Sequence, residues 1–320
     1  MKAVVYRQYG SPDVLKYEEV EKPVPTDDEI LVKVHAVSVN RSDWEGVVGK
    51  PLYARIGGLF KPKDRILGSD IAGTVEAVGK DVRQFKPGDE VFGLLLNYGG
   101  GFAEYACTSG KAFTRKPAGL TFEQAAAIPQ AAFIALQGIR EKGQVQPGQK
   151  VLINGAGGGT GAFAIQLAKM AGAKVTAVDN TEKLDFMRSL GADHVIDYTK
   201  KDFTKNGQQY DLILDVIATR SIFAYQRALK PNGRYFMAGG SVATMFQSLL
   251  LGPLIRRITS RNINLLLVQT ESMDLVYINK LIESGKVKLA IDKRYPLRET
   301  ATAVRYLGEG HAKGKVVITV

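Results

Sequence analysis

Five of the eight residues from Asn154 to Gly161 are glycines, and the stretch reads Asn-Gly-Ala-Gly-Gly-Gly-Thr-Gly. Its best register is Ala156-x-Gly158-x-x-Gly161, a dinucleotide-binding fingerprint with alanine in the first place. Missing side chains at Gly157 and Gly158 let the backbone approach a pyrophosphate, and glycine at 161 lets the following helix pack close to the strand. The residues predicted to contact the cofactor here are Ala156, Gly157, Gly158, Gly159, Thr160 and Gly161.

An acidic residue, Asp179, stands 18 positions after Gly161 (179 − 161), where it ends the next candidate strand. A carboxylate there accepts hydrogen bonds from both hydroxyls of the adenosine ribose and repels a 2′-phosphate, which favours NADH. Lys183 favours the opposite choice, because an ammonium at the start of the next helix could pair with a 2′-phosphate. It could equally be a solvated lysine paired with Asp179. The sequence leans to NADH without deciding, and Tyr198 and Gly239 complete the predicted cofactor contacts.

Strand and helix patterns alternate after residue 150, and amphipathic helix patterns such as Thr181–Leu190 and Ser221–Leu229 separate short apolar runs. This alternation predicts an α/β fold with a doubly wound parallel sheet. The six candidate strands are Val151–Asn154, Lys174–Asp179, His194–Asp197, Asp211–Val216, Arg234–Ala238 and Ile263–Val268.

The first third of the chain has a different sequence pattern. It consists of short runs rich in β-branched residues, such as Ile30–Val37 and Gly73–Val78, bounded by turn residues. This pattern predicts a compact β-rich unit. An alanine-rich segment from Glu123 to about Lys142 is expected to be one helix, and the tail after Ala290 returns to strand-like runs. We therefore expect the nucleotide-binding domain to be inserted within the β-rich one. The expected ranges are residues 1–122 and 269–320 for the β-rich domain and 123–268 for the nucleotide-binding domain.

Composition and charge exclude several classes of protein. Of the 320 residues, 45% are hydrophobic and 23% are charged, which is ordinary globular composition with room for about two domains. The formal net charge is +11, but the basic residues are scattered, so we expect anionic small ligands and no nucleic acid. Cys107 is the only cysteine, which excludes disulfides within the chain and cysteine-built metal sites. No apolar run reaches membrane-spanning length, and we expect a cytoplasmic protein.

Two segments are candidates for surfaces that contact a substrate, a membrane or a second copy of the chain. Residues 242–257 are apolar and then basic. This is typical of a helix over a substrate cleft, the favoured interpretation, or of weak contact with a membrane surface. Ile263–Val268 would be the last strand of the sheet and lie at its edge, with apolar residues where exposed edges usually carry charge. A second copy of the chain could continue the sheet there, so we expect a homodimer.

Motifs along essentially the full length of the chain resemble those of the medium-chain dehydrogenase/reductase superfamily. Besides the glycine run, they are Gly10–Leu15, Leu67–Gly79, Phe85–Gly93, Gly100–Tyr105 and Leu190–Tyr198. The resemblance implies a GroES-like β-rich catalytic domain and a Rossmann domain that binds NAD(P)H.

The zinc alcohol dehydrogenases of this superfamily hold catalytic zinc with Cys, His and Cys, and the matching positions here are Asn40, Ser69 and Gln130. None is a thiolate or imidazole ligand, and one cysteine cannot form the four-cysteine structural zinc lobe, so we expect no zinc. The chain then resembles the zinc-free quinone oxidoreductase branch, which implies reduction of a small-molecule quinone, enone or enal with NAD(P)H. The alternatives are zinc-free alcohol oxidation or ketone reduction, and a non-catalytic NAD(P)-binding protein.

The resemblance also implies the catalytic residues, Asn40 and Asp43. Asn40 matches the branch's asparagine near the nicotinamide, where its amide could hydrogen-bond cofactor or substrate. Asp43 could orient neighbours or substrate, and structural turn-capping is equally expected. Many relatives carry a tyrosine where this chain has Glu45, which leaves the proton donor open. Tyr53 and Tyr98 are candidates, although tyrosines of a β-rich domain more often serve packing.

Overall fold

The computed structural model describes residues 1–56, 58–63, 65–95 and 99–320. The chain divides into two compact units. The first unit consists of residues 1–130, 270–284 and 289–320, and the second consists of residues 131–269 and 285–288. The first boundary therefore lies eight residues after the expected one (130 − 122), and a short return segment, 285–288, belongs to the second unit.

The second unit is built on a six-stranded sheet in which every neighbouring pair is parallel. In chain order the strands are β8 (Lys150–Asn154), β9 (Lys174–Asp179), β10 (His194–Asp197), β11 (Tyr210–Asp215), β12 (Leu229–Met237) and β13 (Asn262–Leu265). Their spatial order, β10-β9-β8-β11-β12-β13, runs outward in both directions from β8. This is the doubly wound arrangement, which confirms the predicted α/β fold, and its switch point lies between β8 and β11.

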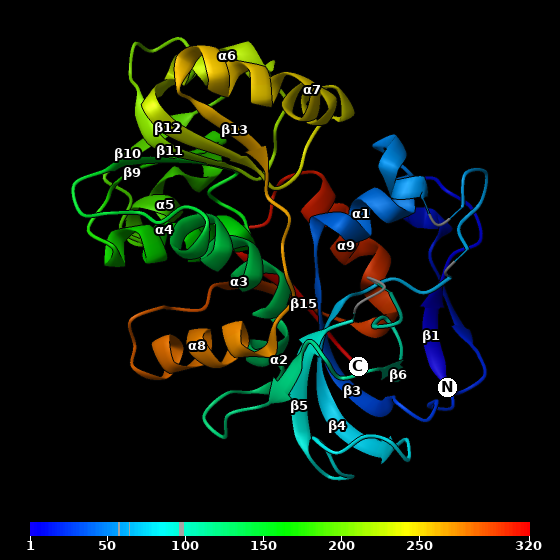
Figure 1. Ribbon diagram of the computed structural model, residues 1–320. Coiled ribbons are helices and arrows are strands. Elements are labelled where there is room, and N and C mark those ends of the chain that lie inside the picture. Colours follow the sequence, from blue (N-terminus) through cyan, green and yellow to red (C-terminus); the bar gives the residue numbers. More distant parts are fainter. Residues whose placement is uncertain (57, 64, 96–98) are drawn as a thin grey trace. The chain divides into compact units, whose positions relative to one another are not determined.

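Helices cover both faces of this sheet, with α4 and α5 on one side and α6 and α7 on the other (Figure 1). Their ranges are α4 (Gly159–Met170), α5 (Leu184–Ser189), α6 (Ile222–Ala228) and α7 (Val242–Thr259). The core between α6 and the sheet contains the fully buried side chains of Leu152, Ile213, Tyr225 and Tyr235. Apolar strands buried on both faces explain why the strand runs are continuous in the sequence.

The single helix expected from Glu123 to Lys142 is wrong, because the chain forms three pieces there: α2 (Phe122–Ala126), α3 (Pro129–Leu136) and a π-turn, Gln137–Glu141. Thr121 caps α2, since its hydroxyl accepts the N–H of Gln124 at 3.2 Å. The break precedes Pro129, whose ring disfavours helical backbone in the residue before it and suits the first turn of a helix.

The first unit contains a seven-stranded sheet to which the first third and the tail of the chain contribute. Its order is β14-β15-β3-β4-β5-β7, and β6 also pairs with β3. The ranges are β3 (Ile30–Val39), β4 (Asp70–Val78), β5 (Glu90–Leu94), β6 (Tyr105–Thr108), β7 (Phe113–Arg115), β14 (Ile291–Pro296) and β15 (Lys315–Thr319). Strand β15 runs antiparallel to β3. The tail therefore completes the sheet begun by the first third, as predicted.

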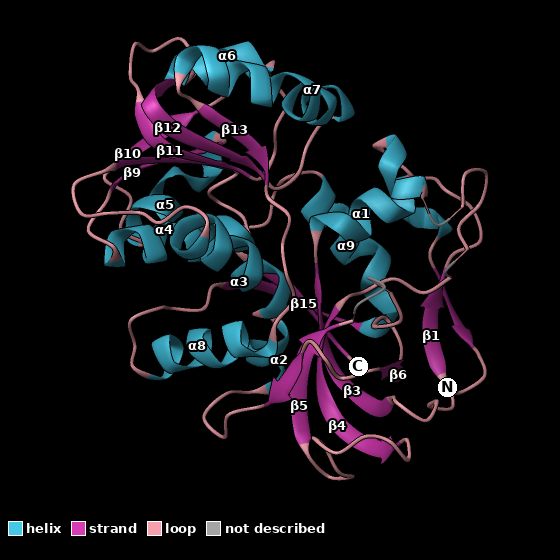
Figure 2. Cartoon of the chain, viewed as in Figure 1, coloured by secondary structure: helices cyan, strands magenta, loops and turns pink. Residues whose placement is uncertain are grey.

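The described part of the first unit also contains a two-stranded sheet and, besides α2, the helices α1 (Arg41–Val48), α8 (Ser272–Glu283) and α9 (Thr300–Gly308) (Figure 2). The strands of the small sheet are β1 (Lys2–Val5) and β2 (Lys16–Glu19). None of the helices in the described ranges is long and apolar enough to cross a membrane.

The edge strand β13 is shorter than predicted, because it ends at Leu265 rather than Val268. The next N–H, that of Leu266, donates to the carbonyl of Met237 on β12 at 2.8 Å, so it faces the inside of the sheet. Leu267 has left the sheet and is 73% exposed. The edge available to another strand is therefore the outer side of Asn262–Leu265.

Candidate functional site

The glycine run forms the turn between β8 and α4, as the sequence predicts. Gly158 is the N-cap of α4, and a Cβ built there would meet nothing closer than the carbonyl oxygen of Gly155, at 3.7 Å. At Gly161 the same Cβ would lie 2.3 Å from the Cα of Ala156, so this position tolerates only glycine. The loop thus combines a tightly packed glycine in the helix with open space over its backbone at Gly158. Such a cradle at a helix N-terminus fits a pyrophosphate.

Asp179 and Lys183 lie beside this loop and both are buried. The carboxylate of Asp179 accepts the N–H of Gly157 at 2.9 Å and that of Asn180 at 2.9 Å. The ammonium of Lys183 lies 3.4 Å from Asp179 Oδ1. A Cβ at Gly157 would be 2.4 Å from Cδ of Lys183, so the lysine stem crosses the loop. Lys183 is expected from the sequence either to pair with a 2′-phosphate of the cofactor or to be a solvated lysine paired with Asp179. The structure shows the pairing with Asp179, but both side chains of the pair are buried.

The two remaining predicted cofactor contacts lie at the same carboxyl edge of the sheet. The N–H of Tyr198 donates to the carbonyl of Asp179 at 3.1 Å, and its side chain is half exposed. The carbonyl of Gly239 accepts the N–H of Ala218 at 2.9 Å. The segment before Ala218 also borders the glycine loop, because a Cβ at Gly155 would lie 3.2 Å from the side chain of Ile217. The carboxyl edge of a doubly wound sheet is where such folds bind ligands.

In the first unit, Asn40 belongs to a buried polar cluster. Its amide nitrogen donates to Asp70 Oδ2 at 2.9 Å and to Ser69 Oγ at 3.3 Å. Its amide oxygen accepts the ammonium of Lys315 at 2.6 Å, and the same ammonium lies 3.2 Å from Asp70 Oδ2. Ser38 donates to that carboxylate oxygen at 3.0 Å. Both amide hydrogens of Asn40 are therefore engaged within the cluster, and only acceptor capacity on its oxygen is left for a ligand.

Asp43 serves the backbone around this cluster. Its carboxylate accepts the N–H of Asn40 at 2.7 Å and the N–H of Gly68 at 2.9 Å, and the side chain is 1% exposed. The first bond belongs to a capping box at the start of α1. Burial raises the pKa of Asp43 to about 7, against the lowering effect of the two backbone donors. Of the two expectations for Asp43, this geometry supports turn-capping and the orientation of Asn40.

The positions that match zinc ligands converge on Asp70, but they do not fit zinc. Gln130 donates its backbone N–H to Asp70 Oδ1 at 3.0 Å, and Ser69 accepts from Asn40. Hydroxyl and amide groups are poor zinc ligands, and the ammonium of Lys315 already holds the oxygen of Asn40. Within the described ranges, no three His, Cys, Asp or Glu side chains gather as a metal site.

Tyr53, one of the two candidate proton donors, is hydrogen-bonded to Glu45. The hydroxyl of Tyr53 donates to Glu45 Oε2 at 3.2 Å, so the glutamate that stands in place of the relatives' tyrosine holds a tyrosine from elsewhere in the chain. Burial raises the pKa of Glu45. Tyr98 lies outside the described residues. Cys107 has a pKa raised to about 11 by burial, which keeps its thiol protonated and unreactive at neutral pH.

The sequence did not reveal Lys315 and Ser38 as members of the Asn40 cluster. Lys315 opens an apolar strand, where a lysine is unremarkable, and it is 245 residues from Asp70 (315 − 70). Ser38 is one of several small residues along β3. No local spacing connects the three positions, since only the pairing of β15 with β3 and of β3 with β4 brings them together.

Comparison with known proteins gives the same picture over both units. Residues 26–118 match the family described as the alcohol dehydrogenase GroES-like domain, and residues 190–318 match the family described as zinc-binding dehydrogenase. The chain is 35% identical over 330 residues to 2-methylene-furan-3-one reductase of Solanum lycopersicum, covering 99% of this chain and 79% of the relative.

A further relative and a solved structure are similar to this chain over nearly its full length. A chloroplastic NADPH-dependent alkenal/one oxidoreductase of Arabidopsis thaliana is 34% identical over 330 residues, again covering 99% of this chain and 79% of the relative. The solved structure of a quinone oxidoreductase from Coxiella burnetii superposes with a TM-score of 0.88 at 30% identity, covering 100% of this chain and 99% of the other. The chain therefore belongs to the medium-chain dehydrogenase/reductase superfamily, in its quinone oxidoreductase branch.

Proposed function

We propose that this protein is an NAD(P)H-dependent reductase of quinones or α,β-unsaturated carbonyl compounds. The observation that carries the proposal is the open backbone at Gly158, at the N-terminus of α4, next to the buried carboxylate of Asp179. The names of the relatives, an alkenal/one oxidoreductase and a quinone oxidoreductase, support the substrate class.

The residues of the second unit would hold the cofactor, which supplies a hydride when bound. Gly158, with open space over its backbone, caps the N-terminus of α4, and the N–H groups of the first turn of α4 would bind the pyrophosphate. Asp179 would accept from the ribose in competition with the N–H of Gly157. Because Lys183 is already paired with that carboxylate, its attraction for a 2′-phosphate is reduced, and we propose a modest preference for NADH.

The residues of the first unit would orient the substrate and manage the proton. A conjugated C=C–C=O accepts hydride at its far carbon, and the enolate that results must be protonated. We propose Tyr53, held by Glu45, as the donor. Asn40, fixed by Lys315 and Asp70, offers only its amide oxygen as a further acceptor, so it would bind a donor group of cofactor or substrate.

We also propose that the protein is a homodimer in which β13 pairs with its counterpart across a two-fold axis. This strand is the last in the sheet order, and no partner strand covers its outer side among the described residues. Its four residues, Asn262–Leu265, carry no charge, unlike most protected edges.

The test of the proposed function is oxidation of NADH and NADPH, followed by absorbance, against a panel of quinones, enals, enones and saturated ketones. We expect turnover with the conjugated compounds and none with saturated ketones. Gly158→Val, which blocks the pyrophosphate cradle, is the control that must abolish turnover. Tight cofactor binding without turnover of any conjugated compound would contradict the proposal and favour a non-catalytic cofactor-binding protein.

A further inference from the structure

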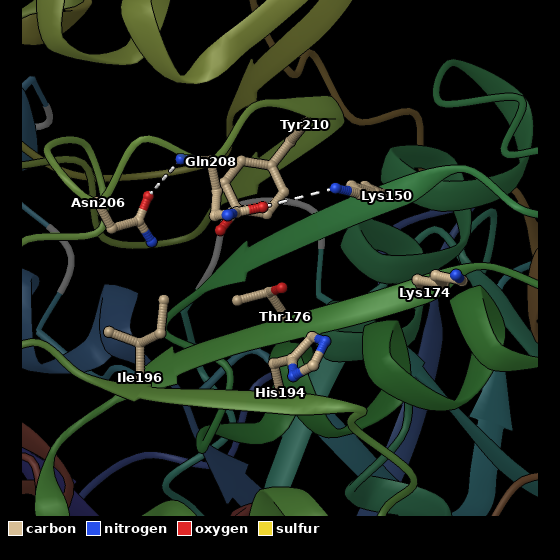
Figure 3. Close-up of a pocket in the computed structure, with 8 residues that line it drawn as sticks. All are labelled: Lys150, Lys174, Thr176, His194, Ile196, Asn206, Gln208 and Tyr210. Carbon is tan, nitrogen blue, oxygen red and sulfur yellow. Dashed lines mark hydrogen bonds between the residues drawn. The ribbon is translucent and has the colours of Figure 1, made fainter.

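A pocket of about 310 Å³ opens on the six-stranded sheet of the second unit, at the amino ends of its strands (Figure 3). Lys150, Lys174 and His194, the first residues of β8, β9 and β10, line it. The glycine loop follows the opposite, carboxyl end of β8. A five-residue strand is roughly 16 Å long. The pocket is therefore separate from the proposed cofactor site.

Strand register places the polar side chains of this pocket on one face of the sheet. Lys150 pairs with Lys174, and His194 pairs with Thr176; partners in a parallel sheet point to the same side. Thr176 is 7% exposed, and it contributes a hydroxyl to the lining of the pocket. The floor of the pocket thus combines a hydroxyl group with two lysines and a histidine.

The segment before β11 forms the opposite wall. The side-chain oxygen of Asn206 accepts the N–H of Gln208 at 2.9 Å, and Gln208 Oε1 accepts the ammonium of Lys150 at 3.5 Å (Figure 3). The amide groups of Asn206 and Gln208 are thereby held at the pocket, each with N–H donors. Ile196 and Tyr210 add apolar surface to the lining.

The charge of the pocket is positive because the nearby carboxylates are engaged elsewhere. Asp211 accepts the backbone N–H of Lys150 at 2.7 Å and pairs with Lys230 at 2.8 Å. Asp193 pairs with Lys169 at 2.8 Å. Among the residues that the structure describes, no carboxylate forms an ion pair with the ammonium of Lys150 or of Lys174. Two unopposed cations at the rim of a concave surface attract an anion.

We propose that this pocket binds a small organic phosphate, independently of the glycine loop. Lysines bind phosphate as point charges, and the Thr176 hydroxyl and the amide N–H groups would complete its hydrogen bonds. Ile196 and Tyr210 would contact a short apolar or aromatic body. The volume lies at the lower end of the range for small-molecule sites, which limits that body to about one ring.

Calorimetric titration of the full-length protein with phenyl phosphate, in the presence of saturating NADH so that the glycine loop is occupied, tests the proposal. We expect one site, and at least tenfold weaker binding for the double variant Lys150→Gln/Lys174→Gln. The matched control, Arg256→Gln/Arg257→Gln, removes two charges from exposed positions on α7 and should leave the affinity unchanged.

A second readout keeps the test valid if the double variant folds poorly. The chain has three histidines, so the imidazole signal of His194 can be assigned by comparison with His194→Asn and followed by NMR in the parent protein. A saturable shift of that signal with phenyl phosphate is expected. No binding under saturating NADH, equal loss of affinity in both double variants, or a titration that leaves the His194 signal in place would overturn the proposal.

Discussion

Replacing Lys315 with methionine should destabilise the first unit strongly, because it leaves a buried carboxylate without its cation. The ammonium of Lys315 lies 3.2 Å from Asp70 Oδ2, and the two side chains are 5% and 0% exposed. Methionine has a similar length but provides neither charge nor a donor. Asn40 would also lose the bond to its amide oxygen, which the ammonium holds at 2.6 Å.

The magnitude follows from what remains around Asp70. Removing one partner of a buried ion pair costs about 3–5 kcal/mol. Three donors would still reach the carboxylate, from Ser38, Asn40 and the backbone of Gln130, so the lower end applies, about 3 kcal/mol. For a unit of this size, such a loss lowers the unfolding midpoint by about 6–12 °C. The double variant Asp70→Asn/Lys315→Met removes both charges but turns an amide NH2 toward one of these donors, so it should recover only part of the loss.

Thermal unfolding followed by tryptophan fluorescence measures this effect in the first unit alone. Trp44 is the only tryptophan of the chain, and it lies in α1, four residues after Asn40. Lys313→Met is the matched control, because Lys313 is exposed two positions away and its change should cost no more than about 0.5 kcal/mol. The unfolding midpoint should fall by at least ~2 °C for each kcal/mol of lost stability. A midpoint for Lys315→Met within about 2 °C of that of Lys313→Met would therefore refute the reasoning.

Four further predictions concern the cofactor, assembly and pH. Gly158→Val should abolish binding of NADH in a fluorescence titration without changing the unfolding midpoint, because its Cβ has open space around it. Asp179→Ser should shift the ratio of kcat/KM values toward NADPH, and Lys183→Ala should mainly weaken the use of NADPH. Leu265→Pro should convert a dimer into monomers in light scattering, because neighbouring N–H groups of a strand alternate in direction and that of Leu265 faces the open edge. Burial raises the pKa of Asp215 from 3.8 to about 6, so this carboxyl should lower the unfolding free energy of the second unit by up to about 3 kcal/mol between pH 4 and pH 6, and Asp215→Asn should remove that contribution.

Each of these predictions has a result that contradicts it. Parent-like affinity for NADH in Gly158→Val would mean that the cofactor does not lie over the loop. A parent enzyme with a strong NADPH preference would show that Lys183 outweighs Asp179. A parent that is monomeric at micromolar concentration would exclude the β13 dimer, and Leu266→Pro, which removes an inward bond, is its control. An equal pH profile in Asp215→Asn would assign the titration to another group.

The sheet of the second unit could be predicted because its signals are local. The strands are short, mostly apolar runs, helices follow β8, β9, β11 and β12, and the glycine run marks the first turn. Prediction failed in the alanine-rich segment, where the local signal of Pro129 was outweighed by the many alanines around it. The chain breaks before Pro129, and the N–H of Gln130 in the next helix reaches Asp70.

The site was predictable in part, for the same reason. The turn between β8 and α4 could be predicted from glycine spacing, since steric contact with Ala156 requires Gly161. The partners of Asp179 could not, because the N–H of Gly157 meets that carboxylate only along the actual path of the loop. The role of Lys315 in the Asn40 cluster could not be predicted, because it depends on strand pairing across almost the whole chain.

The pairing of β15 with β3 has a consequence for how the chain is made. Along one edge of β3, residues 30–33 pair with β6 and residues 36–39 pair with β15, while β4 pairs along the other edge. In synthesis, 277 residues separate Val39 from its partner Val316 (316 − 39), which corresponds to roughly 15–55 s at ~5–20 residues per second. During that time the second unit can fold as a whole, while the strand that leads into Asn40 keeps an open edge. The same late strand delivers Lys315, so the second unit is fully synthesised 27 residues (315 − 288) before Asn40 can gain this partner.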